Sequence, residues 1–308
     1  MKILVTGGAG FIGAHLVRQM MDAGEEVVSL DNLSTGLRDN LPGQARLEIM
    51  DIHDRKVEDL FRKEHFDAVV HLAGQTLVSD SIKDPQNDMF QNIGGTVHIL
   101  ECCRKYGVSR IIFSSSAAAY GDVPETALPI PETLPLVPLS FYGLSKITVE
   151  KYLELYHLLF GLHYVVLRFA NVYGERQGEG GEGGVISIFA KRLAAGKGIT
   201  IFGDGTQTRD FVYAGDIARG IRQALVTDNA DTCYNLSTQE ETSLNDLVSI
   251  FSKVSGKEIV PTYGEPREGD IFRSSLSNRK AVTGLGWEPQ VSLEEGLKRT
   301  YDYFKNQE

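Results

Sequence analysis

The chain contains 308 residues, with a formal net charge of −10 and an isoelectric point of about 5.3. A chain of this length can bury a large core, so we expect one large domain or two interlocked domains. No basic tract is present to neutralise phosphates, which excludes a general nucleic-acid role. No apolar run approaches the roughly 20 residues of a spanning helix, so no membrane association is expected. The first strand is predicted at the N-terminus with no signal peptide before it, which predicts a cytoplasmic location.

The first predicted element is a short buried strand over residues 2–6, apolar and rich in branched side chains. Glycines follow it at intervals of three, and an amphipathic helix begins within the motif. In such a motif one glycine permits a tight turn, one lets the backbone approach a pyrophosphate and one lets the helix pack on the strand. The helix N-terminus then offers free N–H groups to phosphates. The residues expected to bind a dinucleotide here are Gly7, Gly10, Phe11, Ile12 and Gly13.

A second predicted strand, residues 26–30, ends at Asp31. Its distance from Gly13 is close to the roughly 20 residues at which a ribose-binding acid follows a glycine motif. A carboxylate there accepts hydrogen bonds from a ribose 2′-OH and repels a 2′-phosphate, so NAD is favoured over NADP. A glycine turn with a solvated aspartate is the alternative interpretation. The succession of strand, motif, helix, strand and acid favours the dinucleotide site.

Two further predicted strands lead toward the same site. The strand over residues 46–50 ends at a plausible adenine contact, and the strand over 68–71 runs into small residues that let backbone approach the cofactor. His71 is interpreted as a packed strand-end histidine and not as a ligand. The residues expected to bind the cofactor at these strand ends are Asp51, Ile52, Leu72, Ala73 and Gly74.

Predicted strands alternate with helices as far as Phe169, which favours a parallel sheet with helices on both faces. Later strands are predicted over residues 110–114, 164–168 and 209–213, and Asp216 could cap the helix that follows. We expect an α/β fold, a Rossmann-type doubly wound parallel sheet with a smaller mixed α/β C-terminal domain. The expected division places residues 1–174 and a returning segment near 208–235 in the NAD-binding domain, and residues 175–207 and 236–308 in the second domain.

The strongest chemical signal is Tyr142 with Lys146, on a helix predicted near residues 140–160. The two side chains lie one turn apart on one helix face. An ammonium beside a phenol favours the phenolate, so Lys146 is expected to lower the pKa of Tyr142 from its reference of about 10. Such a tyrosine can remove the proton of an alcohol, and a serine of the preceding stretch 114–116 could hold that alcohol. The pattern predicts oxidation of a secondary alcohol.

The three cysteines and seven histidines predict neither disulfides nor a metal. Cys102 and Cys103 are adjacent, and Cys233 lies far away in a predicted strand, so the thiols are expected to be reduced and buried. The histidines show no close-spaced ligand pattern, and no metal site is expected.

Further short segments complete the pattern: Asp31-Asn32-Leu33-Ser34-Thr35-Gly36, Arg168-Phe169-Ala170-Asn171-Val172-Tyr173-Gly174, Phe202-Gly203-Asp204-Gly205, Arg209-Asp210 and Pro266-Arg267-Glu268-Gly269-Asp270. With the motifs above, they resemble the extended short-chain dehydrogenase/reductase family from end to end, and most of all its UDP-glucose 4-epimerase branch. The resemblance implies that Tyr142 is the base, that Ser116 hydrogen-bonds the sugar 4′ oxygen and that Lys146 holds the nicotinamide ribose. It also places Asn32 and Asn92 at the NAD site.

For the nucleotide sugar, the resemblance implies a second set of contacts. Asn171 and Arg267 would meet the diphosphate, Phe202 would stack on uracil, and Arg209 would bind near the uridine ribose and diphosphate. Asp270 belongs to the same set. Two of these assignments have alternatives, because Phe202 could be a core residue and Arg209 could simply pair with Asp210.

The resemblance also narrows the reaction. Dehydratases and decarboxylases of the family carry acids where this chain has Ala117 and Ala118, and methyl groups cannot carry protons. Epimerisation at C4 of a UDP-hexose remains. The position that gates the C2 substituent aligns with Ser274, whose small side chain should admit an N-acetyl group. Gly178 stands where the glucuronate branch tends to have an arginine, which counts against glucuronate.

Three alternatives remain open at this point: a UDP-glucuronate 4-epimerase, an NAD(P)H-dependent 4-ketosugar reductase and a non-catalytic dinucleotide sensor. The resemblance further implies a homodimer, in which the helix near residues 87–106 and the helix carrying Tyr142 form a four-helix interface. Its candidate contact residues are Val97, Leu100, Leu153 and Leu158, although each could equally be a core residue.

Overall fold

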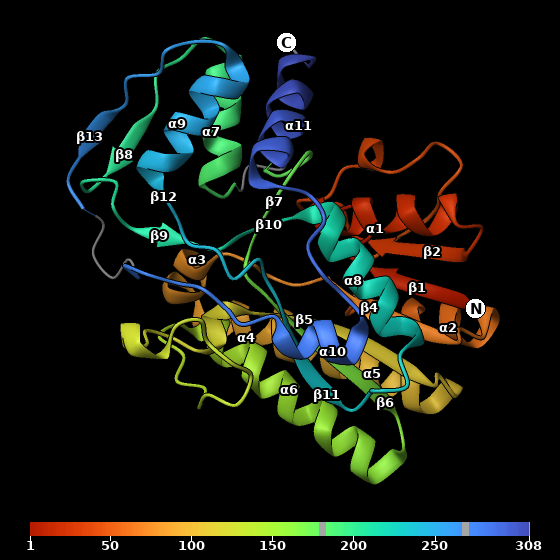
Figure 1. Cartoon of the computed structure of the whole chain (residues 1–308). Helices are drawn as coiled ribbons and strands as arrows, with labels where there is room; N and C mark the ends of the chain where they lie inside the picture. The colour runs from red at the N-terminus through yellow and green to blue at the C-terminus, as the bar shows by residue number, and fades with distance from the viewer. Residues whose placement is uncertain (179–182, 267–270, 308) are drawn as a thin grey trace.

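The computed structural model describes residues 1–178, 183–266 and 271–307, and its centre is a seven-stranded sheet (Figure 1). All its strand pairs are parallel, in the order β11-β6-β5-β4-β1-β2-β3. The predicted doubly wound parallel sheet is therefore confirmed. Its strands are β1 (Lys2–Thr6), β2 (Glu26–Asp31), β3 (Arg46–Ile49), β4 (Ala68–His71), β5 (Arg110–Ser116), β6 (His163–Phe169) and β11 (Thr232–Leu236).

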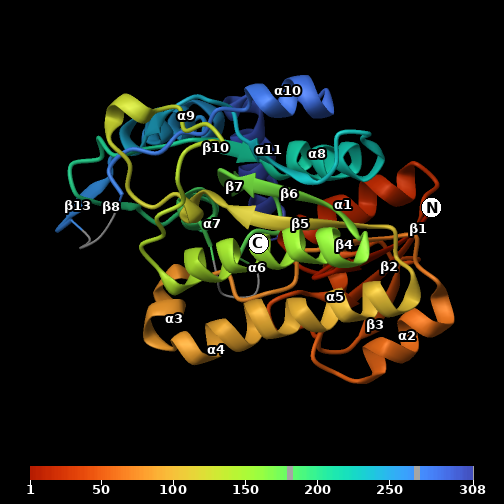
Figure 2. The same cartoon turned by 90° about the horizontal axis from the view of Figure 1, so that it is seen from below.

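Helices cover both faces of this sheet, as the view from below in Figure 2 shows. The central strands are runs of branched residues buried on both faces, as expected of a parallel sheet. One face packs against α1 (Phe11–Asp22) and α8 (Ala214–Val226), and the other against α2 (Lys56–Glu64), α5 (Gly95–Tyr106) and α6 (Phe141–Phe160). Two apolar cores result, one under each layer of helices.

The helix α6 forms as predicted because both its ends carry capping residues. The Ser140 side chain accepts a hydrogen bond from the Gly143 N–H at 3.1 Å, and Gly161 ends the helix with a φ of +72°. The helix predicted near residues 87–106 is instead interrupted. It consists of α4 (Pro85–Met89), a π-helical turn (Phe90–Gly94) and α5.

A smaller C-terminal lobe lies beside the carboxyl ends of the strands (Figure 1). Its helices pack around a third core that includes Phe189, Phe251 and Tyr301. The elements of this lobe are α7 (Val185–Ala194), β8 (Thr200–Phe202), β9 (Thr208–Arg209), β12 (Thr242–Ser243), α9 (Leu244–Ser255), β13 (Thr262–Gly264) and α11 (Leu293–Lys305). The remaining elements are α3 (Val78–Lys83), β7 (Asn171–Tyr173), β10 (Phe211–Tyr213), α10 (Arg279–Leu285) and 3₁₀ turns at Arg38–Asn40, Ala117–Ala119 and Glu125–Ala127.

Two local predictions are corrected. The strand expected over residues 209–213 is split at Asp210, so that β9 pairs with β12 and β10 pairs with β7. Asp216 does not cap α8, because that helix begins at Ala214. The Asp216 carboxylate instead accepts the N–H groups of Gln290 and Val291, both at 3.0 Å, and ties the chain before α11 to the start of α8.

The returning segment joins the large sheet through α8 and β11, while the division into two domains stays a prediction. The three cysteines are free thiols, as predicted, but only Cys102 and Cys103 are buried and Cys233 is half-buried. Within residues 1–178, 183–266 and 271–307, no helix combines the length and the apolarity that crossing a membrane requires.

Candidate active site

A cleft of about 720 Å³ opens at the carboxyl ends of β1, β2, β4, β5 and β6. In open parallel sheets this edge, where the strand order reverses, is where ligands bind. The cleft brings together most residues predicted for the cofactor and all three predicted catalytic residues. Lining it are Gly7, Gly10, Phe11, Ile12, Gly13, Asp31, Asn32, Asp51, Ile52, Leu72, Ala73, Gly74, Ser116, Tyr142 and Lys146.

The glycine loop cannot accept side chains at two positions. Gly7 has a φ of +70°, and a Cβ there would lie 2.8 Å from the backbone nitrogen of Ala73. A Cβ on Gly13 would lie 2.2 Å from the carbonyl oxygen of Gly7. The loop therefore packs directly on the end of β4 and delivers the first turn of α1, with its free N–H groups, to the cleft. This cradle fits the pyrophosphate of a dinucleotide.

Two carboxylates stand at the adenosine side of the cleft. Asp31 is buried and accepts the N–H groups of Ala9 at 3.0 Å and Leu33 at 2.9 Å, while burial raises its pKa. Asp51 accepts a hydrogen bond from the Asn32 side chain at 2.7 Å. Acceptors of this kind suit ribose hydroxyls and repel a 2′-phosphate, which agrees with the preference for NAD.

His71 and Asn92 are buried beneath the residues that line the cleft. His71 is fully buried, its ring nitrogens lie 2.7 Å from Thr6 Oγ1 and 2.9 Å from Thr96 Oγ1, and burial lowers its pKa to about 3. It is the packed histidine that the sequence predicted. Asn92 does not line the cleft, because its side chain is hydrogen-bonded to the backbone of Gln75. Its position there fixes the loop after β4, so the expected direct contact with the cofactor is not supported.

Tyr142, Ser116 and Lys146 meet at the end of β5. The Tyr142 hydroxyl is hydrogen-bonded to the Ser116 side chain. The Lys146 ammonium lies 5.5 Å from the centre of the Tyr142 ring and donates to the Ser114 carbonyl oxygen at 2.9 Å. Lys146 is only 5% exposed. The first turns of α6 thus bring a phenol and a cation, and the end of β5 brings a hydroxyl, to one wall of the cleft.

The expected low pKa of Tyr142 is not what the protein alone produces. Burial raises the pKa of Tyr142 to about 12, against the hydrogen bond to Ser116, which lowers it. Burial also lowers the pKa of Lys146 to about 8. The prediction considered only the neighbouring ammonium. It missed the cost of removing a phenolate from water and the charge of Asp88, both of which raise the pKa of Tyr142.

Asp88 is a functional candidate that the sequence analysis missed. This carboxylate is fully buried and accepts hydrogen bonds from Ser145 at 2.6 Å and from Asn92 at 3.0 Å. Its negative charge raises the pKa of Lys146, whereas burial lowers it, and the charge of Glu150 acts in the same direction as that of Asp88.

The two anions near Lys146 differ in their partners. Glu150 is paired with Arg168 at 2.6 Å, whereas the hydrogen-bond donors to Asp88 are neutral. Asp88 is therefore the less compensated anion near Lys146. Its spacing of one turn from Asn92 was the available sequence signal.

Only some of the residues predicted to bind the nucleotide sugar line this cleft. Asn171 lines it, whereas Phe202, Arg209 and Ser274 are not among its described lining residues. Phe202 is 41% exposed, so it is not a core residue. The Asp210 carboxylate accepts hydrogen bonds from Thr238, Gln239 and Leu276, so its described hydrogen bonds do not match the alternative interpretation, in which Arg209 pairs with Asp210. Arg267 and Asp270 lie outside the described residues. Arg176, which the sequence analysis did not select, adds a cation to the lining.

Residues 3–237 match the NAD dependent epimerase/dehydratase family. The chain belongs to this family. It is 38% identical over 312 residues to the UDP-glucose 4-epimerase of Mycolicibacterium smegmatis, with 99% of each chain covered. Its structure matches that of a UDP-glucose 4-epimerase from Thermotoga maritima, solved with UDP-glucose, at a TM-score of 0.96 and 42% identity, covering 100% of this chain and 99% of the other. The predicted family, enzyme class and NAD cofactor are confirmed.

Similar structures also include enzymes with other named substrates. One is a UDP-N-acetylglucosamine 4-epimerase from Methanobrevibacter ruminantium, at a TM-score of 0.93 and 32% identity, covering 100% of this chain and 99% of the other. Another is a UDP-glucuronic acid 4-epimerase from Bacillus cereus in complex with UDP-glucuronic acid and NAD. Its TM-score is 0.90 and its identity 33%, with 100% of both chains covered. The family resemblance alone therefore leaves the sugar open.

Replacing Asp88 by Asn tests its electrostatic role. Loss of the negative charge removes a contribution that raises the pKa of both Lys146 and Tyr142, so each group should lose its proton at a lower pH. The alkaline limb of kcat/KM against pH should therefore move to lower pH. Asp80→Asn, at an exposed aspartate on α3 that pairs with Lys83 in solvent, is the control and should leave the limb in place. An unchanged limb in Asp88→Asn would contradict the assignment.

Proposed function

We propose that this enzyme interconverts UDP-glucose and UDP-galactose, and their 2-N-acetyl counterparts, by oxidising and re-reducing C4 of the sugar. The observation that carries the proposal is the meeting of Tyr142, Ser116 and Lys146 in the same cleft as the glycine loop and Asp31. A base, an alcohol-binding hydroxyl and a nicotinamide site together form the apparatus for reversible alcohol oxidation. The relatives named UDP-glucose 4-epimerase support the choice of a UDP-hexose.

Ser116 would hold the 4′ oxygen while Tyr142 takes its proton. When bound, NAD supplies the acceptor for the C4 hydride and a positive charge on the nicotinamide ring that favours the Tyr142 phenolate. Loss of one proton and one hydride leaves a 4-keto sugar. Once the ketone has turned its other face toward the nicotinamide site, C4 would be reduced again and Tyr142 would return the proton to the 4′ oxygen, so that no cofactor would be consumed overall.

The surroundings of Ser116 support epimerisation over elimination. The Ser116 hydroxyl oxygen accepts the Ala118 N–H at 3.1 Å, so the two alanines form a short turn beside the cleft. Their methyl groups cannot protonate a leaving hydroxyl or remove a proton from C5. A 4-keto sugar formed here therefore meets no second acid or base on this turn.

Glucuronate is the second candidate because a structural relative is named for it. Gly178 lines the cleft and cannot pair with a carboxylate, which favours a neutral hexose. Arg176 lines the same cleft and could pair with one. A comparison of UDP-glucuronate with UDP-glucose as substrates separates the two, and we expect UDP-glucose to be preferred.

Replacing Tyr142 by Phe tests the assignment of the base. Epimerisation of UDP-galactose should fall by at least the ~10²- to 10⁴-fold typical of a lost acid–base group. NAD should remain bound, since the glycine loop and Asp31 are intact. The matched control is Tyr152→Phe, on the exposed side of the same helix, which should keep wild-type activity. Wild-type turnover in Tyr142→Phe would refute the mechanism. Net consumption of NAD(P)H by the wild type would favour the reductase alternative.

Replacing Ser274 by Tyr tests the N-acetyl substrates. The larger ring should lower kcat/KM for UDP-N-acetylgalactosamine at least ~10-fold, and leave kcat/KM for UDP-galactose within a few-fold. Ser274→Ala keeps the space and should keep both activities. Ser274 is half-buried but not among the described residues that line the cleft, so this proposal depends on the sequence alignment. Equal effects on both substrates would contradict the proposal that Ser274 admits the N-acetyl group.

We also propose a homodimer formed through α6 and the α4–α5 helix. Two of the predicted contact residues are corrected, since Leu100 and Leu153 are fully buried core residues. The support comes from the outer side of α6, where the predicted contact Leu158 is 76% exposed. Two leucines that were not predicted, Leu155 and Leu159, are 52% and 65% exposed beside it. Apolar side chains gathered on one helix face are typical of an interface.

Replacing Leu158 by Glu tests this interface. A charge on the proposed contact surface should shift the protein from dimer to monomer in sedimentation at micromolar concentration. The control is Val260→Glu, a substitution at a similarly exposed residue of the C-terminal lobe, which should leave the dimer intact. A wild-type protein that sediments as a monomer would contradict the proposed interface.

A further inference from the structure

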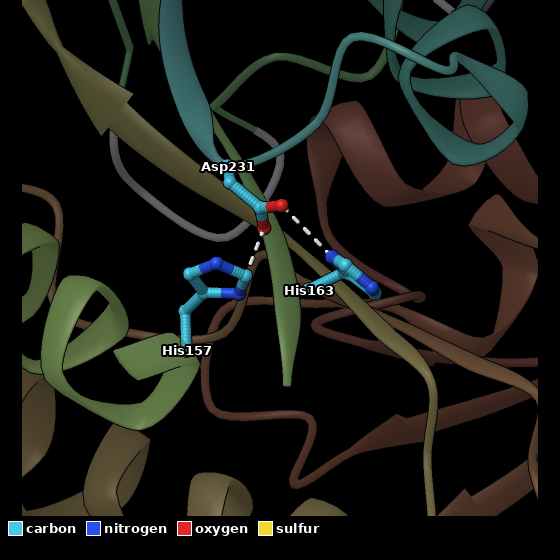
Figure 3. A group of neighbouring side chains, drawn as sticks. All are labelled: His157, His163 and Asp231. Carbon is cyan, nitrogen blue, oxygen red and sulfur yellow. Dashed lines mark hydrogen bonds and ion pairs between the residues drawn. The ribbon is translucent and has the colours of Figure 1, made fainter. Parts of the chain in front are cut away.

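Two histidines and an aspartate meet at the edge of the sheet opposite the cleft (Figure 3). His157 lies near the end of α6, His163 begins β6, and Asp231 directly precedes β11. The amino ends of parallel strands lie at the edge away from their carboxyl ends, so this cluster is separate from the active site. Tyr142 and His157 are fifteen residues apart on α6, which corresponds to roughly 22 Å along the helix.

The three side chains point toward one another with the carboxylate between the rings (Figure 3). His163 Nδ1 lies 2.8 Å from Asp231 Oδ2, and His157 Nδ1 lies 3.2 Å from Asp231 Oδ1. One ligand atom from each residue falls within 4.8 Å of the other two. Small side-chain movements would bring all three to the roughly 2.0–2.2 Å at which nitrogen and oxygen bind Zn²⁺.

The backbone already fixes the carboxylate. The Tyr164 N–H donates to Asp231 Oδ1 at 3.1 Å, and the Asp231 N–H donates to the Tyr164 carbonyl oxygen at 2.7 Å. Hydrogen bonds of this kind orient metal ligands and reduce the ordering that binding requires. Asp231 is therefore held facing the two rings whether or not an ion is present.

One atom of the cluster lacks a hydrogen-bond partner. His157 Nδ1 is buried, yet it makes no hydrogen bond within the described part of the chain despite its closeness to Asp231. Buried polar atoms are rarely left in this state, and each exception needs an explanation. Its 3.2 Å approach to Asp231 Oδ1 is an ion pair only when the ring is protonated. A cation bound between the three side chains would use its lone pair.

We propose that His157, His163 and Asp231 form a binding site for a divalent transition-metal ion of the Zn²⁺ class. Two imidazole nitrogens and one carboxylate oxygen suit Zn²⁺, Co²⁺ and Ni²⁺, whereas Mg²⁺ prefers oxygen ligands. The side chains are 37%, 52% and 26% exposed, so an ion enters from solvent and water completes its coordination. His157 follows the buried Leu153 by one helical turn, on the side of α6 away from the proposed dimer surface.

An ion at this site would join the end of α6 to the starts of β6 and β11. It binds the folded chain, whose ligands come from distant parts of the sequence, and so should stabilise the fold in proportion to its concentration. Because the ligands lie far from the cleft, the ion should not change the chemistry. This proposal reverses the expectation of no metal, which rested on spacing along the sequence alone.

Metal-free protein should be titrated with Zn²⁺ and, separately, with Co²⁺, whose visible absorption reports its ligands. We expect one ion per chain with a dissociation constant of about 10 μM or tighter, a higher Tm with Zn²⁺ and no effect of Mg²⁺. The epimerase rate should stay within about twofold of the metal-free value. Absence of saturable binding would overturn the proposal, and so would saturable binding that leaves the Tm unchanged.

Two variants locate the ion. His163→Gln and Asp231→Asn should each weaken Zn²⁺ binding at least ~10- to 100-fold. Asn tolerates the φ of +62° at position 231 and keeps an oxygen for the Tyr164 N–H, so the second variant should still fold. His65→Asn, at an exposed histidine with a φ of +52° on another helix end, is the matched control and should bind as wild type. Unchanged affinity in both site variants would place the ion elsewhere and refute the assignment.

Discussion

The buried ammonium of Lys146 is the charge around which the active-site edge of the sheet is arranged. It can be held there because the Ser114 carbonyl oxygen accepts a hydrogen bond from it and because Asp88 and Glu150 supply opposite charge. Each of these groups comes from a different element, so the site requires β5, α4 and α6 to be packed as they are. The same packing presents Tyr142 and Ser116 to the cleft that the glycine loop also lines.

Features encoded over a few neighbouring residues could be predicted from the sequence. The glycine spacing and Asp31 specify the dinucleotide cradle because turn geometry and acid placement are properties of one strand–helix–strand unit. The helix carrying Tyr142 was equally accessible, since Ser140 and Gly161 are local capping signals. The sheet followed from the alternation of strands and helices, which leaves few topologies open.

Features that depend on distant contacts were missed. Asp88 gains its role from Ser145, far along the chain, and the raised pKa of Tyr142 comes from burial that no local pattern shows. Leu100 and Leu153 were candidate surface residues because helical periodicity does not say what covers a face. The cluster of His157, His163 and Asp231 also exists only in the fold, where a helix end meets two strand ends. Tertiary packing decides all of these.

The central claim is that the hydrogen on C4 leaves and returns within one closed site, with Tyr142 handling only the proton on oxygen. Isotope tracing tests it most directly: UDP-galactose carrying deuterium at C4 is converted in ordinary water, and the UDP-glucose formed is examined by mass spectrometry and NMR. The account predicts that deuterium is retained at C4 of the product, because the hydride is returned from the cofactor and not from solvent. Replacement of the label by solvent hydrogen would contradict it.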